Sequence, residues 1–264
     1  MTSQFDAKND ATKRKQTSPD SESSSTRGPQ ASVSNEDASR RKFLQIVRGA
    51  GAGLVTAAGM EFVAPSSALA QALDTPEKAL KELLAGNQRF VDLKLTSFEL
   101  DLAILRNRTS ESQEPFAAVL ACADSRVPVE LIFDATIGHI FVARVAGNFV
   151  TSEIIASLEY GAAKLGTKVI LVMGHGSCGA VTAAIANANV EPVAGQISAL
   201  YPHIRPAVNK GGTDPDQVSK VNAVLQAALL RQSSTVISRL VANHQLMVRA
   251  AFYNLGSGIV NLLD

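Results

Sequence analysis

Residues 168–179 read KVILVMGHGSCG. The apolar residues Val169–Met173 follow one lysine and run into a glycine-rich turn that carries His175 and Cys178. A continuous apolar run of this length, closed by turn residues, indicates a strand that is buried on both faces, as in a parallel sheet. The segment therefore predicts a central strand with reactive side chains at its carboxyl end.

Two similar runs precede this one. Phe116–Ala121 is wholly apolar and ends at CADSR, and His139–Val145 is rich in β-branched and aromatic residues and ends at AGN. Between the second and third runs, residues 151–165 place apolar side chains at helical spacing. Apolar strands that alternate with helices predict an α/β fold with a mostly parallel central sheet flanked by helices.

The rest of the chain after residue 70 fits the same domain. Helices are expected over 76–92, 180–188, 217–230 and 234–243, and a strand over 246–253 turns into a short last strand. The helix over 76–92 begins with a Thr-Pro pair, in which threonine caps the helix and proline takes its first position. Residues 71–264 are therefore interpreted as a single α/β domain.

Residues 1–70 have a different character. Residues 1–39 are polar and predict disorder. Then follow SRRKFL, an apolar run rich in Gly and Ala over 49–64, and Ala-Leu-Ala at 68–70. This order is typical of a cleavable export signal, and the paired arginines indicate the twin-arginine type.

The alternative for this segment is a membrane-anchoring helix, but its uncharged run is well short of the ~20 residues that span a bilayer. We therefore expect an exported protein with no stable membrane anchor after cleavage. The periplasm is the default compartment, and the thylakoid lumen is the alternative.

Composition excludes some classes of partner. The 264 residues are 46% hydrophobic and 19% charged, with a formal net charge of +1. Such a charge gives no electrostatic reason to bind nucleic acid. Tryptophan is absent and aromatic residues make up 5%, which also argues against a stacking platform for single strands.

The turn residues suggest a metal site. Cys122 follows one strand, His175 and Cys178 follow another, and ligands of open parallel sheets bind beyond the carboxyl ends of the strands. Two cysteines and one histidine are a recognised ligand set for catalytic zinc, which keeps a fourth position open. The alternatives are a disulfide, two buried thiols, and a histidine satisfied within its loop.

Four motifs in order carry a family resemblance. They are CADSR at 122–126, FVARVAGN at 141–148, SLEYG at 157–161 and GHGSCG at 174–179. In this arrangement the chain resembles the β-class carbonic anhydrases over most of residues 76–262. The resemblance implies zinc on Cys122, His175 and Cys178, and the reversible hydration of CO₂ to bicarbonate and a proton by a zinc-bound hydroxide.

The resemblance also assigns roles beside the metal. Asp124 accepts the hydrogen of the hydroxide, and Arg126 keeps that carboxylate ionised and turned away from the metal. Under some conditions Asp124 becomes the fourth zinc ligand and closes the site. Without the family context, Asp124 and Arg126 would read as an ordinary surface ion pair.

By the same resemblance, Gln113, Phe141 and Tyr160 line the substrate pocket. Each has a plain alternative, as a loop amide or a packed aromatic ring. Val119 stands where bicarbonate-gated members carry tryptophan, so the open, constitutively active form is expected. His139 stands at the pocket entrance, as a proton-transfer group or a solvent-exposed histidine.

Two other functions fit the same residues. One is the hydrolysis of COS or CS₂ on the same zinc site, and the other is a non-catalytic zinc-binding protein. Members of the family form dimers and higher oligomers with pockets at subunit interfaces. The resemblance therefore implies a homodimer or larger homo-oligomer, in which the helix over 76–92 reaches across to a neighbour.

Overall fold

The computed structural model describes residues 72–97, 112–187 and 195–263, all of which belong to the unit Phe62–Asp264. The export signal expected in residues 1–70 lies outside these ranges. In the part of the chain that is described, no helix has the length and apolar character needed to cross a bilayer.

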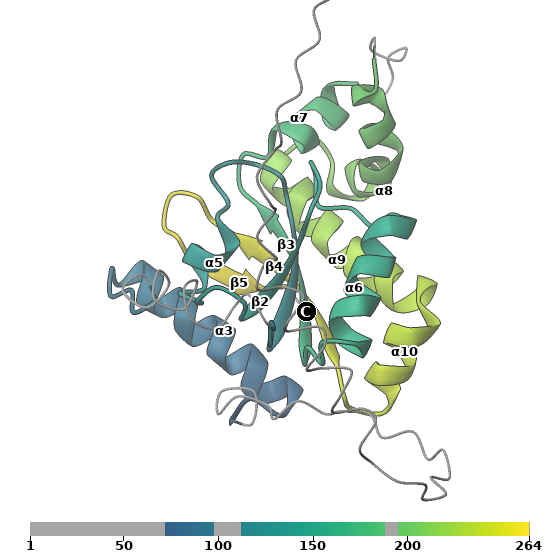
Figure 1. The fold of residues 1–264 in the computed structure, drawn as a ribbon. Helices are drawn as coiled ribbons and strands as arrows, with labels where there is room; N and C mark the ends of the chain where they lie inside the picture. Colours follow the sequence, from purple (N-terminus) through teal and green to yellow (C-terminus); the bar gives the residue numbers. More distant parts are fainter. Residues whose placement is uncertain (1–71, 98–111, 188–194, 264) are drawn as a thin grey trace, which may run out of the picture. The chain divides into compact units, whose positions relative to one another are not determined.

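One five-stranded sheet, in the order β2-β1-β3-β4-β5, forms the centre of the described region (Figure 1). The first four strands in this order are parallel, and β5 runs antiparallel to β4. The strands are β1 (Ala117–Ala121), β2 (Ile140–Arg144), β3 (Val169–His175), β4 (Met247–Tyr253) and β5 (Val260–Leu262). The expected mostly parallel sheet is confirmed.

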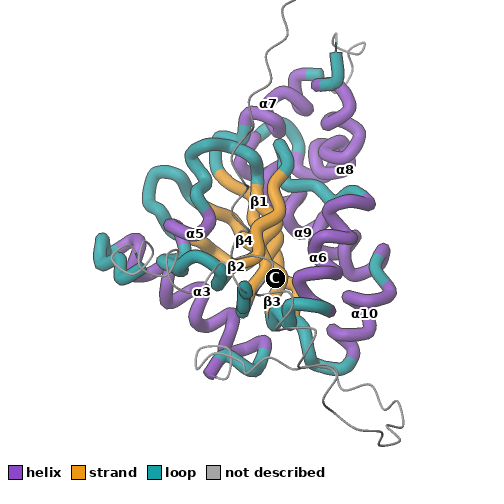
Figure 2. The backbone as a smooth tube through the Cα atoms, in the orientation of Figure 1, coloured by secondary structure: helices purple, strands orange, loops and turns teal. Residues whose placement is uncertain are grey.

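Helices cover both faces of the sheet (Figures 1 and 2). One face packs against α3 (Pro76–Val91) and α5 (Val129–Ile132). The other face packs against α6 (Ser152–Ala163), α9 (Pro215–Ser233) and α10 (Thr235–Ala242). The remaining described helices, α7 (Gly179–Ala186), the 3₁₀ helix η1 (Ile197–Leu200) and α8 (Tyr201–Gly211), gather beyond the carboxyl end of the sheet.

The central strands are buried on both faces, as the apolar runs predicted. All residues of β1 and β3 are buried. In β1, Val119 packs into the core beneath α3, whereas Leu120 packs into the core beneath α6 and α9. Successive residues of the strand thus pack against apolar side chains on opposite faces of the sheet. Polar side chains are therefore accommodated at the ends of the strands.

The expected helix starts are also observed. Thr75 caps α3 by accepting a hydrogen bond from the amide of Lys78, with Pro76 in the first helical position. Ser234 caps α10 in the same way through the amide of Ile237. These side chains satisfy amide groups that the helix itself leaves unpaired.

Helix α9 lies very close to the end of β3. A Cβ atom at Gly174 would be 2.7 Å from the carbonyl oxygen of Ser219 and 2.8 Å from its Oγ. Only glycine leaves room for this approach, which brings the first turns of α9 against the ligand-bearing end of the sheet.

Candidate metal centre

Neighbouring strand ends bring the three expected ligands together. Strands β1 and β3 pair in parallel, with Ala121 opposite Met173. Cys122 follows β1 directly and His175 is the last residue of β3, so both leave the sheet at the same edge. Cys178 follows three residues later as the N-cap of α7.

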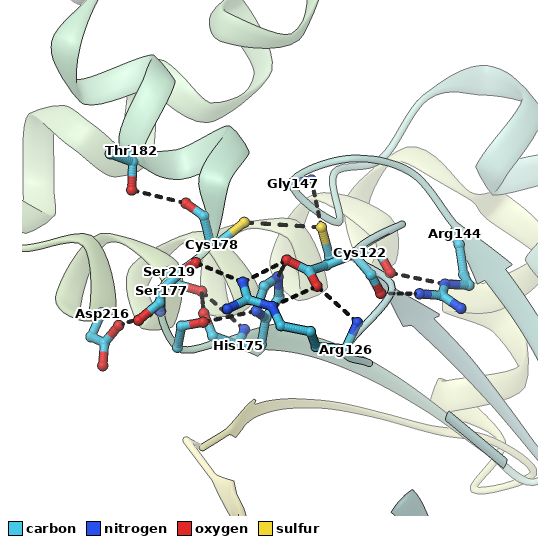
Figure 3. Close-up of polar contacts among 12 residues, drawn as sticks. Cys122, Arg126, Arg144, Gly147, His175, Ser177, Cys178, Thr182, Asp216 and Ser219 are labelled. Carbon is cyan, nitrogen blue, oxygen red and sulfur yellow. Dashed lines mark hydrogen bonds and ion pairs between the residues drawn. The ribbon is translucent and has the colours of Figure 1, made fainter. Parts of the chain in front are cut away.

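The ligand atoms of Cys122, His175 and Cys178 all lie within 4.8 Å of one another, and all three residues are buried (Figure 3). The two cysteines are free thiols with their Sγ atoms 3.9 Å apart, far beyond the ~2.05 Å of a disulfide bond. The disulfide alternative is therefore not supported.

The donor set fits zinc. Two sulfurs bound at about 2.3 Å in a tetrahedron are separated by ~3.8 Å, close to the observed 3.9 Å. The Nε2 atom of His175 is buried without a hydrogen-bond partner. Its Nδ1 atom donates to the carbonyl oxygen of Gly176 at 2.9 Å, which leaves the lone pair on Nε2 for a metal. An orphaned nitrogen beside two thiols is the arrangement that a zinc ion satisfies.

The hydrogen bond between the two thiols moves their pKa values in opposite directions. The hydrogen bond from Cys178 lowers the pKa of Cys122, with support from His175 and the amide of Gly147, and together these outweigh the effect of burial. The same bond and burial raise the pKa of Cys178. A divalent cation favours the thiolate form of both groups, so metal binding releases protons here.

A carboxylate stands beside this cluster. Oδ2 of Asp124 lies 4.0 Å from Nε2 of His175. Arg126 grips the carboxylate with Nε to Oδ1 at 3.0 Å and Nη2 to Oδ2 at 2.8 Å, and its own amide donates to Oδ1 at 2.9 Å. These bonds hold the pKa of Asp124 well below its usual range, so the group is a carboxylate throughout the neutral range.

Several residues for which the sequence predicts no role hold the ligand loops. Arg144 donates to the carbonyl oxygens of Cys122 and Asp124. Asp216 accepts from the amide of Ser177, a residue with φ of 50° in the turn between His175 and Cys178. Both segments that carry the ligands are thus held by side chains from distant parts of the chain (Figure 3).

Ser219, on α9, forms two bonds to one metal ligand. Its Oγ accepts from the amide of His175 at 3.1 Å and donates to the carbonyl oxygen of the same residue at 2.9 Å. In the sequence, Ser219 stands next to Val218 and four residues before Ala223, on the face that helical spacing predicts to be buried, and this pattern could have flagged it.

The residues expected to line the substrate pocket lie towards the amino ends of β1 and β2, whereas the three metal-ligand candidates lie at the carboxyl ends of the strands. Phe141 and Tyr160 are neighbours, with ring centroids 6.4 Å apart, and Tyr160 is exposed. Gln113 is exposed and precedes β1, at the end opposite Cys122. His139 directly precedes β2, and its carbonyl oxygen accepts from the amide of Phe116 at that same end. A substrate-lining role for these residues stays a prediction.

Comparison with known proteins gives one consistent answer. The family model described as carbonic anhydrase matches residues 117–260. Carbonic anhydrase 2 of Mycobacterium tuberculosis is 34% identical over 194 residues, which cover 72% of this chain and 93% of that protein. The structure of the Coccomyxa β-carbonic anhydrase in complex with acetazolamide is 28% identical, with a TM-score of 0.55 over 70% of this chain and 86% of that one. A tetrameric β-carbonic anhydrase of Sordaria macrospora shares the fold at 22% identity, with a TM-score of 0.55 over 61% of this chain and 89% of that one.

Proposed function

The chain belongs to the β-carbonic anhydrase family, and from this we infer that it catalyses the reversible hydration of carbon dioxide to bicarbonate and a proton. The observation that carries the inference is the convergence of Cys122, His175 and Cys178, within 4.8 Å, beside a carboxylate. Zinc held by these residues lowers the pKa of a bound water and so supplies hydroxide near neutral pH.

Asp124 orients the nucleophile. A carboxylate without a proton can only accept hydrogen bonds, so it takes the hydrogen of the attacking oxygen and leaves a lone pair free to face the carbon of CO₂. The bidentate grip of Arg126 keeps this carboxylate ionised and fixes its direction. The pair therefore selects one orientation of the nucleophile before substrate arrives.

Asp124 is also the proposed fourth ligand in a closed form of the site. Its Oδ2 atom is 4.0 Å from the Nε2 atom of His175, so the carboxylate stands close enough to the three ligands that it could join them in holding a metal. The bonds from Arg126 oppose this ligation. The balance between open and closed forms thus depends on this ion pair.

Parallel assays on CO₂, COS and CS₂ with zinc-loaded protein test the proposed activity. Rapid CO₂ hydration with one zinc per chain is expected. Hydrolysis of COS or CS₂ with negligible CO₂ hydration would reassign the substrate, and bound zinc without turnover of any of the three would indicate a non-catalytic zinc protein. The matched control is Asp124→Ala, which removes the orienting carboxylate and leaves all three ligands in place.

The substrate pocket is proposed to lie between two copies of the chain. Gln113 and Cys122 stand at opposite ends of β1, whose five residues alone span about 13 Å. One copy therefore does not bring Gln113 to its own metal ligands, whereas a neighbouring copy can supply it. A homodimer or larger oligomer is part of this proposal, and the tetrameric Sordaria structure shows that the fold is compatible with assembly.

A complementation experiment tests the shared pocket. Asp124→Ala and Gln113→Ala are each expected to be nearly inactive alone. Co-refolding the two variants restores activity if the pocket is shared, because one pocket of each mixed dimer then combines an intact Asp124 with an intact Gln113. If each pocket belongs to one chain, the mixture stays inactive.

Export through the twin-arginine route is likewise proposed, on the ordered layout of residues 1–70. Replacing both Arg40 and Arg41 with Lys in the full chain is expected to leave the protein in the cytoplasmic fraction. Unchanged recovery from the periplasmic fraction would contradict this route.

A further inference from the structure

A stripe of polar side chains runs along the buried side of α9 towards the metal centre. Its members stand three, three and four residues apart, which places them on one helical face. They are Asp216, Ser219, Asn222 and Gln226. The last three are buried, and each member bonds to the backbone of a segment that carries or supports a metal ligand.

Within the stripe, Asn222 and Gln226 form a relay with a fixed direction. The amide of Val150 donates to Oε1 of Gln226 at 2.9 Å, and Nε2 of Gln226 donates to Oδ1 of Asn222 at 3.3 Å. Nδ2 of Asn222 then donates to the carbonyl oxygen of Gly147 at 2.9 Å. A backbone N–H only donates and a backbone carbonyl only accepts, so the two ends of the relay set the orientation of both side-chain amides.

Gly147 connects this relay to a metal ligand. Its amide donates to Sγ of Cys122 at 3.3 Å (Figure 3). Its φ angle is 88°, and a Cβ atom there would lie 2.6 Å from Cδ1 of Ile204, so the position requires glycine. Glycine does not hold its own torsion angles, and the bond from Asn222 supplies that restraint on the peptide that follows.

We propose that Asn222 is a positioning residue, which acts through Gly147 to hold an N–H···S hydrogen bond on Cys122. An amide that donates to a metal-bound thiolate draws electron density from the sulfur. The thiolate then donates less charge to the metal, which becomes the stronger Lewis acid. The inference rests on the proposed function, because it concerns how the same site is tuned.

The test replaces Asn222 with Leu, which keeps the size of the side chain and removes its donor. In the cobalt-substituted protein, the thiolate-to-cobalt charge-transfer band is expected to move to longer wavelength, because the sulfur becomes more electron-rich. In the zinc enzyme, kcat/KM is expected to fall about 10-fold at neutral pH, which is the smallest loss typical when a group that supports a metal ligand is removed. The fall shrinks in mild alkali as the pH profile shifts upward.

Gln226→Met provides a second variant in case Asn222→Leu does not fold. It breaks the relay one step further from the metal and is expected to shift the band in the same direction by a smaller amount.

Asn87→Leu is the matched control. Asn87 is also a buried asparagine, and it bonds to the backbone of Ile132, Gly258 and Val260, away from the metal loops. It should lower the melting temperature without moving the band or the pH profile.

If the relay variants lower only the melting temperature, as the control does, Asn222 is merely structural and the inference is wrong. If the wild-type protein fails to hydrate CO₂ at all, the proposed function fails. The cobalt band still tests the role of Asn222 in that case.

Discussion

Arg126→Met tests the claim that an ion pair keeps the site open. The substitution removes the bonds from Nε to Oδ1 and from Nη2 to Oδ2 of Asp124, and it also removes the bond from Nη2 to the carbonyl oxygen of Ser177. The backbone amide of residue 126 still donates to Oδ1 at 2.9 Å. The carboxylate of Asp124 therefore loses its side-chain hydrogen bonds and becomes free to turn towards the metal ligands.

The size of the effect follows from the exposure of the pair. A buried hydrogen bond to a charged group contributes about 1.5–3 kcal/mol, whereas an exposed ion pair contributes about 0.2–1 kcal/mol. The Asp124 side chain is 16% exposed and that of Arg126 is 53% exposed, which places the bidentate pair between these limits. We take the pair to contribute a factor of about ten to the stabilisation that the held carboxylate gives the transition state, which lies between those two limits.

Stopped-flow CO₂ hydration near pH 8 measures this loss. The variant is expected to retain one zinc per chain and to lose about 10-fold in kcat/KM, since kcat/KM measures the loss of transition-state stabilisation directly. Arg126→Lys keeps the positive charge without the planar fork and should fall between the two proteins. Activity within twofold of wild type, on the same scale, would refute the reasoning because the carboxylate would then be held without the guanidinium.

Asp124→Ala should abolish CO₂ hydration and leave zinc bound, as measured by rate assay and metal content; loss of zinc would show that the carboxylate is a standing ligand. Burial alone would raise the pKa of Asp134, but bonds from Arg89 and two backbone amides hold that pKa below its usual value. Asp134 thus stabilises the folded protein when the pH is above about 4, the pKa of aspartate in the unfolded chain, and this stabilisation is lost as pH falls through the native pKa. Urea titrations of wild type and Asp134→Asn should therefore begin to converge below about pH 5 and keep converging as pH falls towards the lowered native pKa of Asp134; a constant gap over this range would contradict this. Gly174→Ala should destabilise the protein by about 1–3 kcal/mol, because the new Cβ meets the backbone of Ser219 at 2.7 Å; an unchanged melting temperature would show that α9 shifts freely.

The sheet and the ligands could be predicted because their signals are local. The apolar run Val169–Met173 predicts a buried strand without any other information. The turn that follows carries His175 and Cys178 within a few residues. Parallel pairing then brings Cys122 to the same edge without further information. These inferences need only the short-range pattern and the general rule for strand ends.

Helix α8 was not expected because its sequence argues against it. Pro206 lies inside the helix, where proline removes a backbone hydrogen bond. Packing of Ile204 and Ala207 in the apolar layer beyond the sheet stabilises the helix in spite of this. Tertiary contacts thus override the local preference. No pattern within residues 201–211 predicts that these residues pack against the apolar cluster beyond the sheet.

The hydrogen bonds that hold the ligands could not be predicted, because the two partners of each bond are distant in sequence. Ser219 stands 44 residues from His175, and Asn222 stands 75 residues from Gly147. Only the docking of α9 against β3, which Gly174 permits, creates these pairs. Both ligand segments are consequently fixed to one helix, so a change that moves α9 displaces them together. Metal affinity and fold stability are therefore coupled in this protein, and a variant on this face of α9 is informative only beside a control of equal burial elsewhere.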